Sequence, residues 1–200
     1  MTKAFIAALV LPIAWAQNGA RHVHHTLSAK STTLPQVAGL TIPDIELLNQ
    51  HGEKVHFYSD LVKGKVVAIN TIFTTCTTIC PPMGNNFSRL RRLLGANAGL
   101  DVNLISITVD PDVDGPERLD KWSRQFGEMG PGWTLLTGPK ADVDALLKAL
   151  QLFAADRQEH APVALIGGDA AGDWVRCSAL LTPSRIAAII QTKLDLIAKH

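Results

Sequence analysis

The sequence is poor in cysteine and nearly free of net charge. Its 200 residues include only three cysteines, at positions 76, 80 and 177, which is too few for a fold stapled by disulfides. The odd number leaves one thiol unpaired or two thiols available for chemistry. A formal net charge of +1 gives no reason to expect nucleic acid as a partner. Because 46% of the residues are hydrophobic and 18% are charged, we expect one folded domain with a substantial core.

Long apolar runs are absent except at the start, which reads MTKAFIAALVLPIAWAQ. Residues 5–15 form an apolar stretch of signal-peptide length, shorter than the roughly 20 residues of a membrane-spanning helix. We predict a signal peptide over residues 1–16, cleaved after Ala16, then a flexible leader over 17–34 and a folded domain over 35–200. The mature protein is expected to be exported and soluble in a periplasmic or other extracytoplasmic, oxidising compartment. Membrane association is expected only if the signal segment is not cleaved.

The order of apolar patterns predicts an α/β fold. Continuous β-branched runs indicate buried strands, and apolar residues at helical spacing indicate amphipathic helices between them. Parallel strands need such crossover helices, so a central mixed β-sheet flanked by helices is the simplest arrangement. Thioredoxin-like folds have this order, here with an added N-terminal β-hairpin. The predicted strands cover 42–48, 55–58, 66–73, 104–109, 133–136, 162–166 and 174–180, and the helices follow residues 80, 116, 143 and 182.

The stretch TIFTTCTTICPPM places Cys76 and Cys80 where a buried strand ends and a helix begins. Backbone N–H groups and the helix dipole at such a junction favour the thiolate form of cysteine. Three intervening residues put the two thiols on one face of a helical segment, where they can share an ion or form a disulfide. Two thiolates with one imidazole would suit Cu(I), whereas structural zinc usually takes four ligands. A dithiol that reduces a partner's disulfide fits the same pair.

A third ligand would have to come from a distant histidine. His160, in QEHAPVALIG, directly precedes a predicted buried strand that should lie near the cysteine loop. A histidine at such a position is also commonly an ordinary surface or hydrogen-bonding residue. The leader motif RHVHH could bind Cu(II) or zinc, or its histidines could be there by chance. The six histidines other than His160 are His22, His24 and His25 of this leader motif, His51 and His56 of the first hairpin, and His200 at the C-terminus.

Four further residues have simpler structural interpretations. Asp110 and Asp114 could tune the site electrostatically, but we expect them to form a turn and a helix cap. Met83 begins the apolar face of a helix and is expected to pack in the core. Cys177 lies on a predicted strand and is expected to be a small buried hydrophobe.

Four blocks of the sequence together resemble the Sco/SenC family: NTIFTTCTTICPPM, SITVDPDVDGPERL, GPGWTLLTG and EHAPVALIGGDAAG. They occur in the family's order and span most of residues 34–190. The resemblance implies a copper-binding protein that helps to assemble the copper-A site of cytochrome c oxidase, with ligands Cys76, Cys80 and His160. Thr77 stands where the family often has proline.

The resemblance implies copper as the bound metal, with Cu(I) favoured and Cu(II) possible, and a copper-A-bearing oxidase subunit or another copper acceptor as the partner. We expect a chaperone rather than an enzyme. The alternative is a thiol–disulfide reductase, in which Cys76 and Cys80 would be the catalytic redox pair acting on an oxidised cysteine pair of the acceptor. That activity would need both cysteines but not His160, so the two functions can be separated by experiment.

Overall fold

The computed structural model describes residues 34–127, 130–168 and 172–198. All of them belong to one compact unit, Thr33–His200. The predicted signal peptide, the leader up to residue 33 and the RHVHH motif lie outside the described residues, as does His200. In the described part of the chain, no helix has the length and apolar character needed to cross a membrane.

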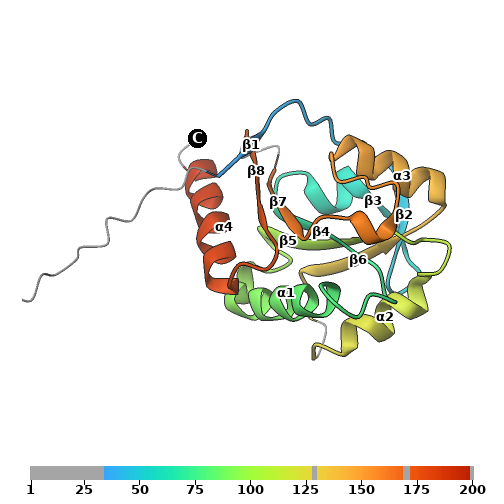
Figure 1. Cartoon of the computed structure of the whole chain (residues 1–200). Helices are drawn as coiled ribbons and strands as arrows, with labels where there is room; N and C mark the ends of the chain where they lie inside the picture. The colour runs from blue at the N-terminus through green and yellow to red at the C-terminus, as the bar shows by residue number, and fades with distance from the viewer. Residues whose placement is uncertain (1–33, 128–129, 169–171, 199–200) are drawn as a thin grey trace, which may run out of the picture. The chain divides into compact units, whose positions relative to one another are not determined.

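The described residues form one mixed sheet in the order β1-β8-β7-β4-β5-β6-β2-β3 (Figure 1). The central strands β4, β5 and β6 are parallel, β7 runs antiparallel to β4, and β8 runs antiparallel to β7. Strand β2 pairs antiparallel with both β3 and β6. The strands are β1 Gln36–Val37, β2 Glu46–Asn49, β3 Lys54–His56, β4 Val66–Ile72, β5 Val102–Thr108, β6 Trp133–Thr137, β7 Val163–Gly167 and β8 Trp174–Ser178.

Helices cover both faces of this sheet. Every residue of β4 and β5 is buried, as expected for parallel strands that lie between two helical layers. Two of the helices provide the crossovers between consecutive parallel strands, α1 from β4 to β5 and α2 from β5 to β6. The helices are α1 Cys80–Leu94, α2 Pro116–Arg124, α3 Lys140–Ala149 and α4 Pro183–Ile197.

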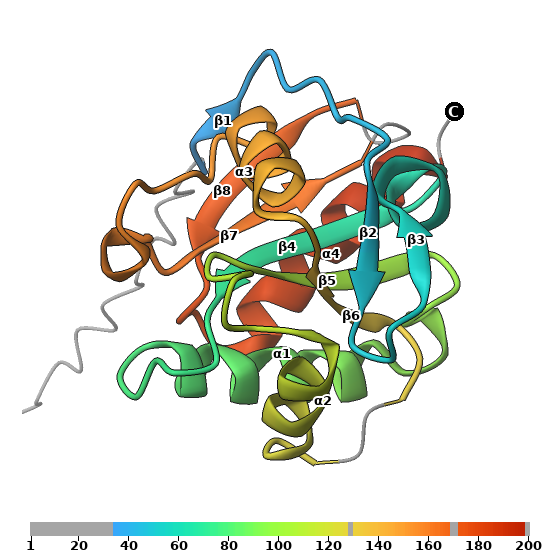
Figure 2. The same ribbon diagram turned by 90° about the vertical axis from the view of Figure 1, so that its right-hand side faces the viewer.

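Two hydrophobic clusters separate the helices by face (Figure 2). The first lies under α1, α2 and α4 and includes Met83 and Cys177, which confirms that both pack in the core. The second lies under α3 and a single helical turn, η1 Phe57–Val62. The predicted mixed sheet with helices on both faces is therefore confirmed.

An aromatic cluster holds the helix that begins at Cys80 against the rest of the domain. Trp122 packs edge-on against Phe126 and Trp133, and Phe87 of α1 lies beside Trp133. Gly84 makes this approach possible, because a Cβ there would lie only 2.5 Å from the Phe126 ring. The N-terminal end of α1, and the thiol it carries, is thus fixed by tight packing one turn further on.

The structure differs from the predicted elements at the two edges of the sheet, which are formed by β3 and β1. The second strand of the first hairpin ends at His56 rather than at Tyr58. The Asp44 carboxylate accepts hydrogen bonds from the N–H groups of Tyr58 and Ser59, so the chain turns into η1 there. Strand β1 was not predicted, because its two residues are placed by backbone pairing with β8 and carry no periodic pattern.

Candidate metal centre

The candidate site lies at the carboxyl end of β4, at the centre of the sheet. The chain leaves β4 at Ile72, passes through the cysteine loop and enters α1 at Cys80. Strand β7 runs antiparallel beside β4, with Ala164 opposite Asn70, so the segment before β7 reaches the same end of the sheet. This topology brings His160, eighty residues away in sequence, to the cysteine pair.

The three predicted site residues are all buried, and they contact one another in pairs. Cys80 Sγ lies 3.7 Å from Nε2 of His160, and the Cys80 N–H donates to Sγ of Cys76 at 3.4 Å. Both cysteines are free thiols. Among the described residues no three His, Cys, Asp or Glu side chains already converge as a set that could hold a metal ion. A shared ion would therefore require the side chains of Cys76, Cys80 and His160 to move closer together.

The hydrogen bonds of His160 define which nitrogen faces the thiols. Its Nδ1 lies 2.6 Å from the carbonyl oxygen of Arg157, which can only accept, so Nδ1 carries the proton. Nε2 then presents its lone pair to Cys80, whose thiol can donate to it. The edge of the Phe73 ring also packs against the imidazole, with ring centroids 5.4 Å apart. A backbone carbonyl on the far nitrogen is the arrangement that orients histidines that bind metals.

The two thiols differ strongly in acidity. Burial raises the pKa of Cys76, but hydrogen bonds from the backbone and thiol of Cys80 and from Thr78 outweigh it and lower the pKa to about 7. Burial raises the pKa of Cys80 to about 12, and the negative charges of the Cys76 thiolate and Asp114 act in the same direction. At neutral pH, Cys76 is therefore partly a thiolate and Cys80 is a thiol.

This asymmetry predicts selective alkylation of the reduced protein. Only the thiolate reacts with iodoacetamide, so modification of Cys76 should rise with pH, reach half its maximal rate near pH 7, and precede modification of Cys80. Mass spectrometry of peptides after a short pulse at several pH values measures both rates. Equal rates at Cys76 and Cys80 across this range would contradict the assignment.

A pocket of about 320 Å³ opens from the surface onto Cys76 and His160. Its walls include Cys76 and His160 together with Gln158 and the loop residues Thr75, Thr77 and Thr78. The three threonines are exposed, whereas Cys80 is fully buried. An incoming group would therefore meet Cys76 first.

The structure corrects the prediction for Asp114. The turn is confirmed, because the N–H groups of Val113 and Asp114 both donate to the carbonyl of Asp110. The cap is wrong, because α2 begins after Gly115 with no side-chain cap. Instead the fully buried carboxylate of Asp114 accepts from the N–H and hydroxyl of Thr74 and from the hydroxyl of Thr108. Asp114 thus ties the start of the cysteine loop to the end of β5.

Sequence reasoning missed two residues near the site. Thr74 links the cysteine loop to Asp114, and Arg157 provides the carbonyl bonded to His160. The sequence gives only weak signals for either role. Thr74 is a hydroxyl residue at the end of a strand, and Arg157 lies three positions before a candidate ligand, and neither feature indicates a site residue without the contacts of the folded chain. Cys177, by contrast, is buried on β8 as predicted, and burial raises its pKa to about 11.

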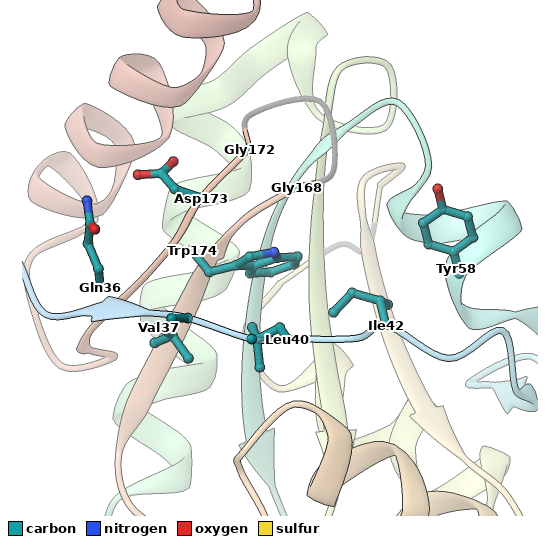
Figure 3. Close-up of a pocket in the computed structure, with 11 residues that line it drawn as sticks. Gln36, Val37, Leu40, Ile42, Tyr58, Gly168, Gly172, Asp173 and Trp174 are labelled. Carbon is teal, nitrogen blue, oxygen red and sulfur yellow. The ribbon is translucent and has the colours of Figure 1, made fainter.

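A second pocket, of about 670 Å³, is remote from these residues (Figure 3). It lies beside Gly168, just beyond the end of β7, whereas His160 precedes the start of that strand. Figure 3 shows Val37, Leu40 and Trp174 grouped at this pocket. Among the described residues, no cysteine or histidine lines it, so the candidate metal chemistry belongs to the smaller pocket at Cys76 and His160.

A mixed sheet with a CxxxC pair at a strand-to-helix junction, and with an imidazole beside the pair at the same end of the sheet, defines a thioredoxin-like protein with a thiol-based site. The sequence model of the SCO1/SenC family matches residues 35–171, and the chain belongs to that family. This assignment agrees with the resemblance carried by the four sequence blocks.

Similar proteins come from several bacteria. The chain is 40% identical over 90 residues to the SCO1 protein homolog of Bacillus subtilis, which is 45% of each of the two proteins. A second similar protein is BsSco, a member of the Sco family of cytochrome c oxidase assembly proteins in which a disulfide switch was identified. Its structure matches with a TM-score of 0.63 and 25% sequence identity, over 78% of this chain and 94% of that one. The copper-bound structure of Bradyrhizobium japonicum ScoI shares the fold at 24% identity and a TM-score of 0.62, covering 74% and 96%.

Proposed function

We propose that the protein binds copper and delivers it to an acceptor such as the copper-A site of cytochrome c oxidase. The observation that carries the proposal is the 3.7 Å contact between Cys80 Sγ and the unprotonated Nε2 of His160, with Cys76 adjacent. Two sulfurs and one imidazole nitrogen form a soft donor set that suits Cu(I), with Cu(II) also accessible. Membership in the Sco/SenC family supports the same assignment.

The residues would take up the metal by exchanging a proton for it. The Cys80 thiol can donate its proton to Nε2 of His160, 3.7 Å away, and the ion would take the place of that proton. Cys76, already partly a thiolate at neutral pH, would complete the set from the side that faces the pocket. Since Cys76 is also the ligand nearest the surface, an acceptor would reach the copper there and exchange ligands one at a time.

Anaerobic Cu(I) titration of a His160→Ala variant tests the proposal. Loss of the imidazole is expected to weaken Cu(I) binding by about 100-fold, at the upper end of what loss of an outer-shell partner costs, because a ligand itself is removed. Competition with a chromophoric Cu(I) chelator measures the affinity. His51→Ala is the matched control, because His51 is exposed in the first hairpin turn. A His160→Ala protein that holds Cu(I) as tightly as the wild type would remove His160 from the site.

A second candidate function, thiol–disulfide reduction, is favoured by the unequal acidity of the thiols. The Cys76 thiolate would attack a disulfide of the acceptor, forming a mixed disulfide and releasing one acceptor thiolate. Cys80 would then lose its proton and attack Cys76 Sγ, which releases the second acceptor thiolate and leaves a Cys76–Cys80 disulfide. An external dithiol would have to reduce that disulfide before the next cycle. Retention of this activity by His160→Ala would separate it from copper binding.

The proposal includes export. The apolar start of the chain supports a signal peptide over residues 1–16, with a leader over 17–34 and the working domain over 35–200. The proposed location is periplasmic or otherwise extracytoplasmic. In this proposal the imidazoles of His22, His24 and His25 would collect Cu(II), so deletion of the leader should lower Cu(II) uptake without changing Cu(I) affinity.

A further inference from the structure

Arg157 joins three separate segments around the candidate site. It begins the short helical turn η3 Arg157–Glu159, immediately before His160. Its guanidinium forms an ion pair with Asp110, in the turn that follows β5. The same guanidinium lies 5.8 Å from the centre of the Phe73 ring, at the end of β4. The side chain therefore links the segment before β7 to the ends of the two neighbouring strands.

The backbone of the same residue holds the imidazole. The carbonyl of Arg157 accepts the Nδ1–H of His160 at 2.6 Å, which leaves Nε2 directed at Cys80. The other hydrogen bonds of this turn are local, since the side chain and carbonyl of Asp156 accept from the N–H groups of Gln158 and Glu159. Those local bonds shape the turn, but they do not attach it to the sheet.

We propose that Arg157 is a positioning residue for His160, acting through what we call the Arg157 clasp: its ion pair with Asp110 and its contact with Phe73. The clasp places the carbonyl of residue 157 where it selects the Nδ1–H tautomer of His160. It thereby presents the lone pair of Nε2 to the thiols before any metal arrives. Because the Arg157 side chain is 44% exposed, the ion pair contributes little to global stability, and its effect is local to this turn.

This inference rests on the proposed function only where it predicts a change in copper affinity. A ligand that is already held in the correct tautomer and orientation loses less free energy to reorganisation when it binds a metal. Outer-shell partners of metal-binding histidines act in this way. The tautomer itself is a property of the metal-free protein. The clasp can therefore be tested whether or not the protein binds copper.

The first test measures the His160 tautomer directly. Long-range ¹H–¹⁵N spectra of the imidazoles distinguish the Nδ1–H form from the Nε2–H form. In the full-length reduced protein we expect His160 to show only the Nδ1–H form, and in Arg157→Gln to show a mixture of both. Asp110→Asn should give the same mixture, because it breaks the clasp from the other side. Arg124→Gln, which removes an exposed ion pair with Asp120 on α2, is the matched control and should leave the spectrum unchanged. An unchanged spectrum in Arg157→Gln would overturn the proposal.

The second test measures Cu(I) affinity by chelator competition. Arg157→Gln is expected to weaken binding about tenfold, and Arg157→Lys, which keeps the ion pair, should recover part of this loss. In a His160→Ala background, Arg157→Gln should have no further effect, because the clasp acts only through the imidazole. An equal loss in both backgrounds would show a general structural role and overturn the proposal. A wild-type protein that binds no copper would refute the proposed function, while the tautomer measurement would still decide the clasp.

Discussion

Replacing Cys80 with serine is expected to abolish tight Cu(I) binding. Cys80 is fully buried and is the thiol that contacts His160, so the substitution removes the sulfur at the centre of the proposed donor set. A hydroxyl is a hard donor and remains protonated in this environment, so it cannot replace a thiolate toward Cu(I). The loss should exceed the roughly 100-fold that removal of an outer-shell partner costs. Anaerobic chelator competition, with copper quantified after desalting, measures it.

Cys177→Ser is the matched control for this experiment. Cys177 is similarly buried, on β8, but it faces the hydrophobic cluster and makes no contact with His160 among the interactions of the described residues. The substitution should lower stability slightly and leave Cu(I) affinity unchanged. Retention of tight binding by Cys80→Ser, or an equal loss in Cys177→Ser, would contradict the assignment of Cys80 as a ligand.

Replacing Asp114 with alanine is expected to destabilise the domain by about 3 kcal/mol or more. The change would leave the N–H and hydroxyl of Thr74 and the hydroxyl of Thr108 without their buried acceptor. A buried donor that loses its partner costs about 1–3 kcal/mol, and bonds to a charged acceptor are the stronger kind. Urea denaturation, monitored by tryptophan fluorescence, gives the free energy of unfolding.

Asp112→Ala is the control for Asp114, because Asp112 lies in the same turn but its side chain is exposed. It should change the free energy of unfolding by less than about 0.5 kcal/mol. Since Thr74 begins the cysteine loop, Asp114→Ala should also weaken Cu(I) binding, although Asp114 is no ligand. If Asp114→Ala were as stable as Asp112→Ala, the proposed role of Asp114 in holding the cysteine loop against β5 would be refuted.

The acidity of the two thiols supports both candidate functions, and this overlap has a physical cause. A nucleophilic dithiol and a soft-metal site both need a thiolate near the surface, which the hydrogen bonds around Cys76 provide. The two functions differ in the role of the buried thiol, Cys80, which attacks Cys76 in a reductase and binds the metal in a copper site. With His160 at 3.7 Å, Cys80 has a nitrogen partner that can share an ion, which a redox pair alone does not require. His160 is therefore the residue whose removal separates the two functions.

The sequence alone determined the fold class and the position of the cysteine pair. Alternation between apolar strands and amphipathic helices is a local pattern, and it predicted the parallel strands β4, β5 and β6 with their crossover helices. The same pattern placed Cys76 and Cys80 at a strand-to-helix junction. His160 was predicted from its place before a buried strand together with the family resemblance, and β7 does lie beside β4.

Only the tertiary structure decided how these residues are held. The contacts of Cys80 with His160, of Thr74 with Asp114 and of Arg157 with Asp110 join residues that lie 40 to 80 positions apart. Such contacts depend on strand register and on the path of irregular loops, and neither leaves a periodic signal in the sequence. For the same reason the different acidities of Cys76 and Cys80 could not be read from their spacing, because burial and hydrogen bonding in the folded chain set them.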